Sequence, residues 1–144
     1  MKNALNNDLI TNWLTLTQIQ MNVANELEAN LQEKYQLSLK EFYLLLFLSE
    51  ASEKKLKLQQ LESMVGLSQS AVSRLVSRFE AKGCGALKRI ACSDDRRSIY
   101  TSLTSIGQDK LDKAQVTFEE VLLTAFPEKQ IKQLLEHMLH AKQT

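Results

Sequence analysis

A chain of 144 residues is long enough for one domain with a substantial hydrophobic core. With 44% hydrophobic residues, one proline and four glycines, the composition argues against disorder and favours helix. Two cysteines are too few for a disulfide framework, no apolar run approaches a membrane span, and the N-terminus lacks the basic-then-apolar order of a signal peptide, so we expect a cytoplasmic protein.

The net charge of +1 is unevenly distributed along the chain. Residues 1–65 carry six lysines and eight acidic residues (−2), residues 66–100 carry seven basic and three acidic residues (+4), and residues 101–144 carry five lysines and six acidic residues (−1). The middle segment holds every arginine of the chain, namely Arg74, Arg78, Arg89, Arg96 and Arg97. A basic segment between near-neutral flanks is typical of a protein that binds nucleic acid, and the alternative is an uneven surface without a function.

The first predicted helix runs from about Asp8 to about Lys34. Its apolar residues recur at helical spacing: Leu9, Trp13, Leu16, Val23, Leu27 and Leu31. Such a helix would be about 40 Å long. It is too long to pack on this small domain alone, so part of it is expected to pack elsewhere, for example on a second copy of the chain.

Three shorter helices are predicted next. Ser38 and Glu41 have the spacing of a capping box, which opens a helix that is apolar nearly all round at residues 42–49. After the polar residues 50–55, a short helix at residues 58–65 ends at Gly66. Ser68 then caps a helix that is expected to run to Lys82, before Gly83.

Two strands are predicted near residues 86–92 and 99–103, with the charged residues 93–97 between them. Thr104 caps a long helix, and Pro127 ends it and begins a last one. The predicted order is α-α-α-α-β-β-α-α, which is mainly helical.

The helix that follows Ser68 divides into two faces. The stripe expected to be buried consists of Val72, Leu75, Val76 and Phe79. The opposite face carries hydroxyls, an amide and two arginines, with no acidic residue before Glu80: Gln69, Ser70, Ser73, Arg74, Ser77 and Arg78. Short serines allow close approach to the major groove, and Gln and Arg can bind base edges, so a helix-turn-helix is predicted. The alternative is a helical corner with a serine-rich exposed side.

The charged tip between the strands completes a winged helix. Arg96 and Arg97 can enter the narrow, negative minor groove beside the major-groove contact. Asp95 could pair with Arg97 and fix its direction. The alternative is a solvated turn with compensating charges.

These features resemble the MarR family of bacterial winged-helix transcription regulators. The matching segments are 67-LSQSAVSRLVSRFEAKG-83 and 95-DRRSIYTSLT-104, followed by Ile106 and Gly107. The helix order elsewhere fits as well, so the resemblance covers nearly the whole chain. It implies an obligate homodimer whose terminal helices interlock and whose two reading helices bind a pseudo-palindrome with half-sites about 34 Å apart.

Carried over residue by residue, the resemblance implies DNA contacts from the helix and the wing: Ser68, Gln69, Ser70, Ser73, Arg74, Ser77, Arg78, Asp95, Arg96 and Arg97. It implies one domain over 1–144, with 38–104 as the winged-helix DNA-binding region and 1–37 and 105–144 mainly as dimerisation helices. One departure stands out, because Gly85 has the family's spacing to the wing aspartate whereas Gly83 is in helix register. Cys84 and Gly85 therefore resemble an insertion that would change the angle of the wing.

Members of the family are commonly released from DNA by a small aromatic or amphipathic molecule. Trp13, Phe42, Tyr43 and Phe47 are candidates to line such a pocket, and the alternative is that they belong to the core. Cys84 and Cys92 flank the first wing strand, so a redox switch is conceivable beside the alternative of two small residues near the surface. His137 and His140 lack further ligands nearby, and no metal site is predicted.

We therefore expect a cytoplasmic homodimeric repressor that binds double-stranded DNA and needs no cofactor. An enzyme is not expected, because the chain lacks a phosphate-binding glycine loop and a Ser-His-Asp grouping. Two alternatives remain open: a winged-helix protein-interaction module with little DNA affinity, and a repressor switched by cysteine oxidation.

Overall fold

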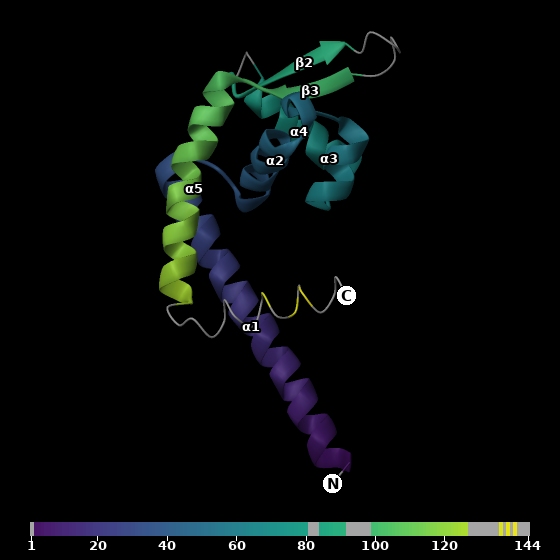
Figure 1. Ribbon diagram of the computed structural model, residues 1–144, viewed down its shortest axis with the longest axis vertical. Helices are drawn as coiled ribbons and strands as arrows, with labels where there is room; N and C mark the ends of the chain where they lie inside the picture. Colours follow the sequence, from purple (N-terminus) through teal and green to yellow (C-terminus); the bar gives the residue numbers. More distant parts are fainter. Residues whose placement is uncertain are drawn as a thin grey trace.

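The computed structural model describes residues 2–80, 84–91 and 99–126 together with residues 136, 138 and 140, and its side chains are described from Asp8 onward. Figure 1 shows the described elements, with a small sheet at one end of the molecule and α1 extending toward the other. In chain order they are α1 (Lys2–Tyr35), α2 (Leu39–Glu50), a 3-10 turn η1 (Ser52–Lys54), β1 (Lys55–Lys57), α3 (Leu58–Val65), α4 (Gln69–Phe79), β2 (Leu87–Ala91), β3 (Ile99–Leu103) and α5 (Ser105–Ala125).

Helix α2 lies at the centre of the core, as its nearly continuous apolar sequence predicts. Its buried apolar side chains are Phe42, Leu44, Leu45 and Leu48. The predicted capping box is confirmed, because the Ser38 hydroxyl accepts from the Glu41 N–H and the Glu41 carboxylate accepts from the Ser38 N–H. The start of this helix is therefore determined by local sequence, and its burial by packing against α1, α3 and α5.

The sheet has three antiparallel strands in the order β1-β3-β2. The two wing strands lie where they were expected. The prediction that residues 50–55 are merely a polar connection is wrong at its end, because Lys55 begins β1 and pairs with Ser102. Three residues with the sequence Lys-Leu-Lys carry almost no strand signal of their own, and long-range pairing with β3 determines their conformation.

Helix α1 is longer than expected, and only part of it packs on the rest of the chain. Its 34 residues span about 51 Å. The C-terminal part lies against α5 (Figure 1), where the Tyr35 hydroxyl is 2.9 Å from the Lys113 carbonyl oxygen and 2.8 Å from the Thr117 hydroxyl. Between Leu9 and Met21, many large apolar side chains are exposed: Leu9, Ile10, Trp13, Leu14, Leu16, Ile19 and Met21.

The connection between α4 and the wing differs from the sequence-based prediction. Helix α4 ends at Phe79, with Glu80 already extended, so the expected end at Lys82 is wrong. Gly85 adopts a left-handed conformation (φ +76°), and its N–H donates to the Glu80 carbonyl oxygen at 3.1 Å. The helix therefore stops early and Gly85 makes the turn into β2, whereas Gly83 lies outside the described residues.

Within the described residues, no helix is both long and apolar enough to cross a membrane. The expected last helix, after Pro127, lies almost wholly outside those residues. Of that segment, residues 136, 138 and 140 are described as helical.

Candidate nucleic-acid interface

Helices α3 and α4 form the predicted helix-turn-helix. Gly66 ends α3 in a left-handed conformation (φ +76°), and the Ser68 hydroxyl caps α4 by accepting from the Ala71 N–H at 3.3 Å. On the inner side of α4, Val72, Val76 and Phe79 are buried. The cap and this apolar stripe position α4 so that its other side faces outward.

The outward face of α4 has the composition that the sequence predicted. Ser73 is half-buried on this face. The other five residues are exposed: Gln69, Ser70, Arg74, Ser77 and Arg78. The Ser70 hydroxyl lies 3.3 Å from the Ser68 hydroxyl, and Arg74 Nε donates to the Ser70 carbonyl oxygen at 3.4 Å. The face therefore presents short hydroxyls and cationic side chains, and no carboxylate within α4 itself.

Two ion pairs join the end of α4 to neighbouring elements. Arg78 Nη1 lies 3.1 Å from Glu41 Oε2 of α2, and Arg89 Nε of β2 lies 2.5 Å from Glu80 Oε1. Arg89 also donates to the Ser77 hydroxyl at 3.3 Å. Sequence reasoning identified neither Glu41 nor Arg89 as part of this surface, because each lies far from its partner along the chain.

The outer face of the wing sheet carries a basic and aromatic group that sequence reasoning also missed. The register places Lys57 opposite Tyr100, and Lys88 opposite Ser102 on the same face. The ammonium groups of Lys55 and Lys57 lie 4.8 and 5.7 Å from the centroid of the Tyr100 ring. This group could have been predicted only if β1 had been predicted, because the pairing of β1 with β3 brings Lys55 and Lys57 beside Tyr100.

The tip of the wing lies outside the described residues. The DNA contacts of Asp95, Arg96 and Arg97 therefore remain predictions, and so does the redox role suggested for Cys92. Cys84 is described as a free thiol on the surface. Among the residues that the structure describes, no group of three or more His, Cys, Asp or Glu side chains could hold a metal ion.

Three of the four residues predicted to line an effector pocket lie together on α2, beside Phe118 of α5. Phe42 stacks on Phe118 of α5, with ring centroids 4.6 Å apart and planes at 11°, and Tyr43 contacts Phe42, Phe47 and Phe118. Burial raises the pKa of the Tyr43 hydroxyl above its ordinary value of 10.0. Trp13 does not join this cluster, because it is 66% exposed in the N-terminal half of α1.

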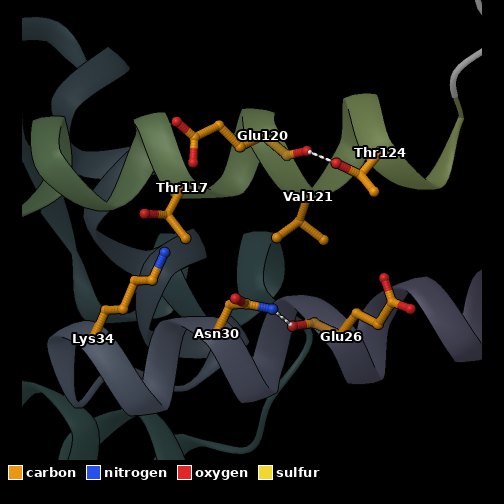
Figure 2. A pocket seen from close by; sticks show the side chains of 7 residues that line it. All are labelled: Glu26, Asn30, Lys34, Thr117, Glu120, Val121 and Thr124. Atoms are coloured by element: carbon orange, nitrogen blue, oxygen red, sulfur yellow. Dashed lines mark hydrogen bonds between the residues drawn. The ribbon is translucent and has the colours of Figure 1, made fainter.

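Among the concave regions that the described residues form, two lie elsewhere on the surface. One of about 260 Å³ lies between α1 and α5. Figure 2 shows the residues that line it: Glu26, Asn30, Lys34, Thr117, Glu120, Val121 and Thr124. The other, of about 360 Å³, lies beside α4 and is lined by Lys40, Leu67, Ala71, Arg74, Leu75 and Arg78. Neither is lined by the aromatic residues predicted to bind an effector, so that assignment stays a prediction.

Comparison with known proteins finds a family match over part of the chain and similar folds over most of it. Residues 35–98 match the model of the MarR family. The fold is similar to that of the transcriptional regulator BldR from Sulfolobus solfataricus, with a TM-score of 0.78 and 23% identity over 94% of this chain and 95% of that one. No curated protein matches the chain significantly by sequence.

Two further similar structures contain DNA. Sco3205, a MarR family transcriptional regulator from Streptomyces coelicolor in complex with DNA, has a TM-score of 0.76 and 22% identity over 90% of this chain and 82% of that one. A mutant of MarR from Escherichia coli complexed with operator DNA has a TM-score of 0.74 and 17% identity over 94% and 95% of the two chains. Residues 35–98 thus match the MarR family, and the mainly helical winged-helix fold of the chain is similar to that of MarR family transcriptional regulators.

Proposed function

We propose that the protein is a homodimeric repressor that binds a pseudo-palindromic site in double-stranded DNA. The observation that carries the proposal is the outward face of α4, which combines exposed Gln69, Ser70, Arg74 and Ser77 with no carboxylate of its own. In this proposal residues 38–104 read DNA, and residues 1–37 and 105–144 mainly form the dimer.

Helix α4 suits the major groove for two reasons. Ser70 and Ser77 are short and exposed, so the backbone of the helix can approach the base edges closely. Gln69 and Arg74 have side chains that form paired hydrogen bonds with adenine and guanine, respectively. Ser68 caps the helix. In this proposal its hydroxyl and the backbone N–H groups of the first turn contact a phosphate.

The wing supplies the second contact. Strands β2 and β3 pair in register from Leu87 opposite Leu103 to Ala91 opposite Ile99, and the segment that joins them contains Asp95, Arg96 and Arg97. We assign the two arginines to the minor groove, where a narrow groove attracts cations, and Asp95 to the orientation of Arg97. Two of the similar structures contain DNA, which supports binding of DNA by this fold.

The exposed apolar side of α1 supports the dimer. At 100° per residue, Leu9, Ile10, Trp13 and Leu14 fall on one side of the helix and Thr15 on the opposite side. A soluble monomer rarely exposes so many large apolar side chains together, and a second copy of the chain would cover them. Dimerisation would also set the distance between the two copies of α4.

We assign repression to occupancy of the operator, and release to a small aromatic or amphipathic molecule. Tyr43 and Phe47 are half-buried between α2 and α5, at the junction of the reading region and the dimer helices. A ligand there would act only through a difference in affinity between DNA-competent and incompetent spacings of the two copies. Trp13 of either copy is free to contribute in the dimer, because it is exposed in one chain.

The test compares variants on a duplex selected by the wild-type protein and on a scrambled duplex. Arg74→Ala is expected to weaken binding to the selected duplex by about 1–3 kcal/mol and to leave the scrambled duplex nearly unaffected. Arg97→Ala is expected to weaken both duplexes alike. Lys113→Ala is the control, because this exposed lysine pairs with Asp109 on α5, away from α4. Equal and small effects of the two arginine variants would contradict the assignment of helix and wing.

A further inference from the structure

Arg78 and Glu41 form an ion pair of unequal exposure. The Glu41 side chain is completely buried, whereas the Arg78 side chain is 62% exposed, and Arg78 Nη1 lies 3.1 Å from Glu41 Oε2. Oε2 accepts no hydrogen bond from any described residue. The guanidinium therefore provides the charge that compensates this oxygen, and a buried carboxylate without such a partner is strongly unfavourable.

The other oxygen of the same carboxylate fixes its direction. Oε1 accepts from the Ser38 N–H at 2.7 Å, and the Ser38 hydroxyl accepts from the Glu41 N–H at 3.0 Å. One oxygen of Glu41 is thus held by the N-terminus of α2 and the other is directed toward α4. The N-terminal end of the α2 dipole also favours the negative charge.

The N-terminus of α2 is attached to α1 as well. The Glu28 carboxylate of α1 accepts from the Leu39 N–H. A continuous series of polar contacts therefore runs from α1 through the start of α2 to Arg78 in the last turn of α4. Because α1 belongs to the proposed dimer region, this series connects that region with the reading helix.

Arg74 is in a different situation. Among the described residues its polar contact is the 3.4 Å interaction with the Ser70 carbonyl oxygen of its own helix, and it has no carboxylate partner there. The Arg74 side chain can turn toward DNA without leaving a buried carboxylate uncompensated. If Arg78 turned toward DNA, Glu41 would lose its compensating charge.

We propose that Arg78 is a positioning residue that holds α4 at its reading angle through Glu41, and that Arg74 is the arginine of α4 that determines base specificity. This inference rests on the proposed DNA-binding function. Arg78 then affects operator binding by fixing α4, and it neutralises no phosphate and reads no base.

The experiment is a double-mutant cycle on a duplex selected by the wild-type protein, with Glu41→Gln, Arg78→Gln and the double variant. Each single variant is expected to weaken affinity for the selected duplex by about tenfold, and the double variant by no more than either single one. The slope of log affinity against log salt is expected to equal the wild-type slope in all three. Arg78→Lys keeps a cation near Glu41 and is expected to restore part of the affinity.

A contact of Arg78 with DNA would give a different pattern. Glu41→Gln, which alters a buried group, would then leave affinity unchanged, and Arg78→Gln would either lower the salt slope by about 0.9 per phosphate contact or lose preference at one base pair. Either result would overturn the inference.

Stability is measured on the same samples, so that binding is compared below the unfolding transition of every variant. Lys113→Gln removes the same charge from α5 and serves as the matched control, with affinity and slope expected to stay at wild-type values. If the wild-type protein selects no duplex at all, the proposed DNA-binding function fails. If it selects one and Glu41→Gln is neutral, only the positioning role of Arg78 fails.

Discussion

The hydroxyl of Thr104 donates to the Gly85 carbonyl oxygen at 2.6 Å and thereby joins the start of α5 to the turn that begins the wing. The Thr104 hydroxyl oxygen also accepts from the Gly107 N–H at 3.1 Å and thereby caps α5. Thr104→Ala removes both contacts and is expected to lower the free energy of unfolding by about 1–2 kcal/mol. Thr104→Ser keeps the hydroxyl and is expected to lose much less. Urea denaturation of the two variants checks this, and equal losses would show that the hydroxyl contributes nothing.

Gly107 is required by the close approach of α5 to Ala86. A Cβ built on Gly107 would clash with the Ala86 carbonyl oxygen and would lie 2.6 Å from Leu103 Cδ1. Gly107→Ala is therefore expected to lower the free energy of unfolding by an amount at the upper end of the range of about 1–3 kcal/mol. The loss is large because the Ala86 backbone cannot move aside as a side chain can. Ser105→Ala, at an exposed position of the same helical turn, is the control and should change the unfolding midpoint little. A Gly107→Ala variant as stable as this control would contradict the packing described here.

Much of the fold could be predicted because its signals are local. Ser38 with Glu41, Ser68, Gly66 and Thr104 cap or end helices in the structure as their sequence context indicates. Each of these motifs acts within four residues, so a single sequence contains the whole interaction. The resemblance to the MarR family was likewise carried by short contiguous segments, and the family match confirms it.

The features that could not be predicted depend on partners far apart in the sequence. Strand β1 forms because Lys55 meets Ser102, and α4 ends early as Gly85 returns to Glu80. Arg78 of α4 pairs with Glu41 of α2, a residue 37 positions earlier (78 − 41), and no local pattern indicates this pair. Periodicity therefore identified the outward face of α4 but could not separate an arginine available to DNA from one held by a buried carboxylate.

The exposed apolar side of α1 predicts how the proposed dimer can be weakened. Leu14 is 60% exposed in the single chain, so Leu14→Asp should leave the folded monomer intact and place a charge in the dimer contact. Sedimentation velocity is expected to show a shift toward monomer over a range of protein concentrations. Thr15→Asp, on the opposite side of α1, introduces the same charge and should leave the dimer unchanged. The dimer surface assigned to α1 would be wrong if both variants behaved alike.

Tyr43 predicts a loss of stability at high pH. Burial raises the pKa of its hydroxyl in the folded protein above the ordinary 10.0, so the neutral phenol contributes stability that is fully present below pH 10.0 and is lost as the pH rises through the folded-state pKa. Tyr43→Phe keeps the ring contacts and cannot ionise. The unfolding free energy of the wild type should therefore fall relative to that of Tyr43→Phe as the pH rises above 10.0. Parallel pH profiles of the two proteins would argue against burial of this hydroxyl.

The most direct measurement of the central claim is selection of bound duplexes from a random DNA pool by the purified protein, at a low and a high salt concentration. The account predicts enrichment of an inverted repeat whose half-sites lie about one helical turn, roughly 34 Å, apart, with affinity that falls steeply as salt rises. Binding without an enriched motif would contradict sequence-specific reading by α4 and would favour a winged-helix module that binds another protein.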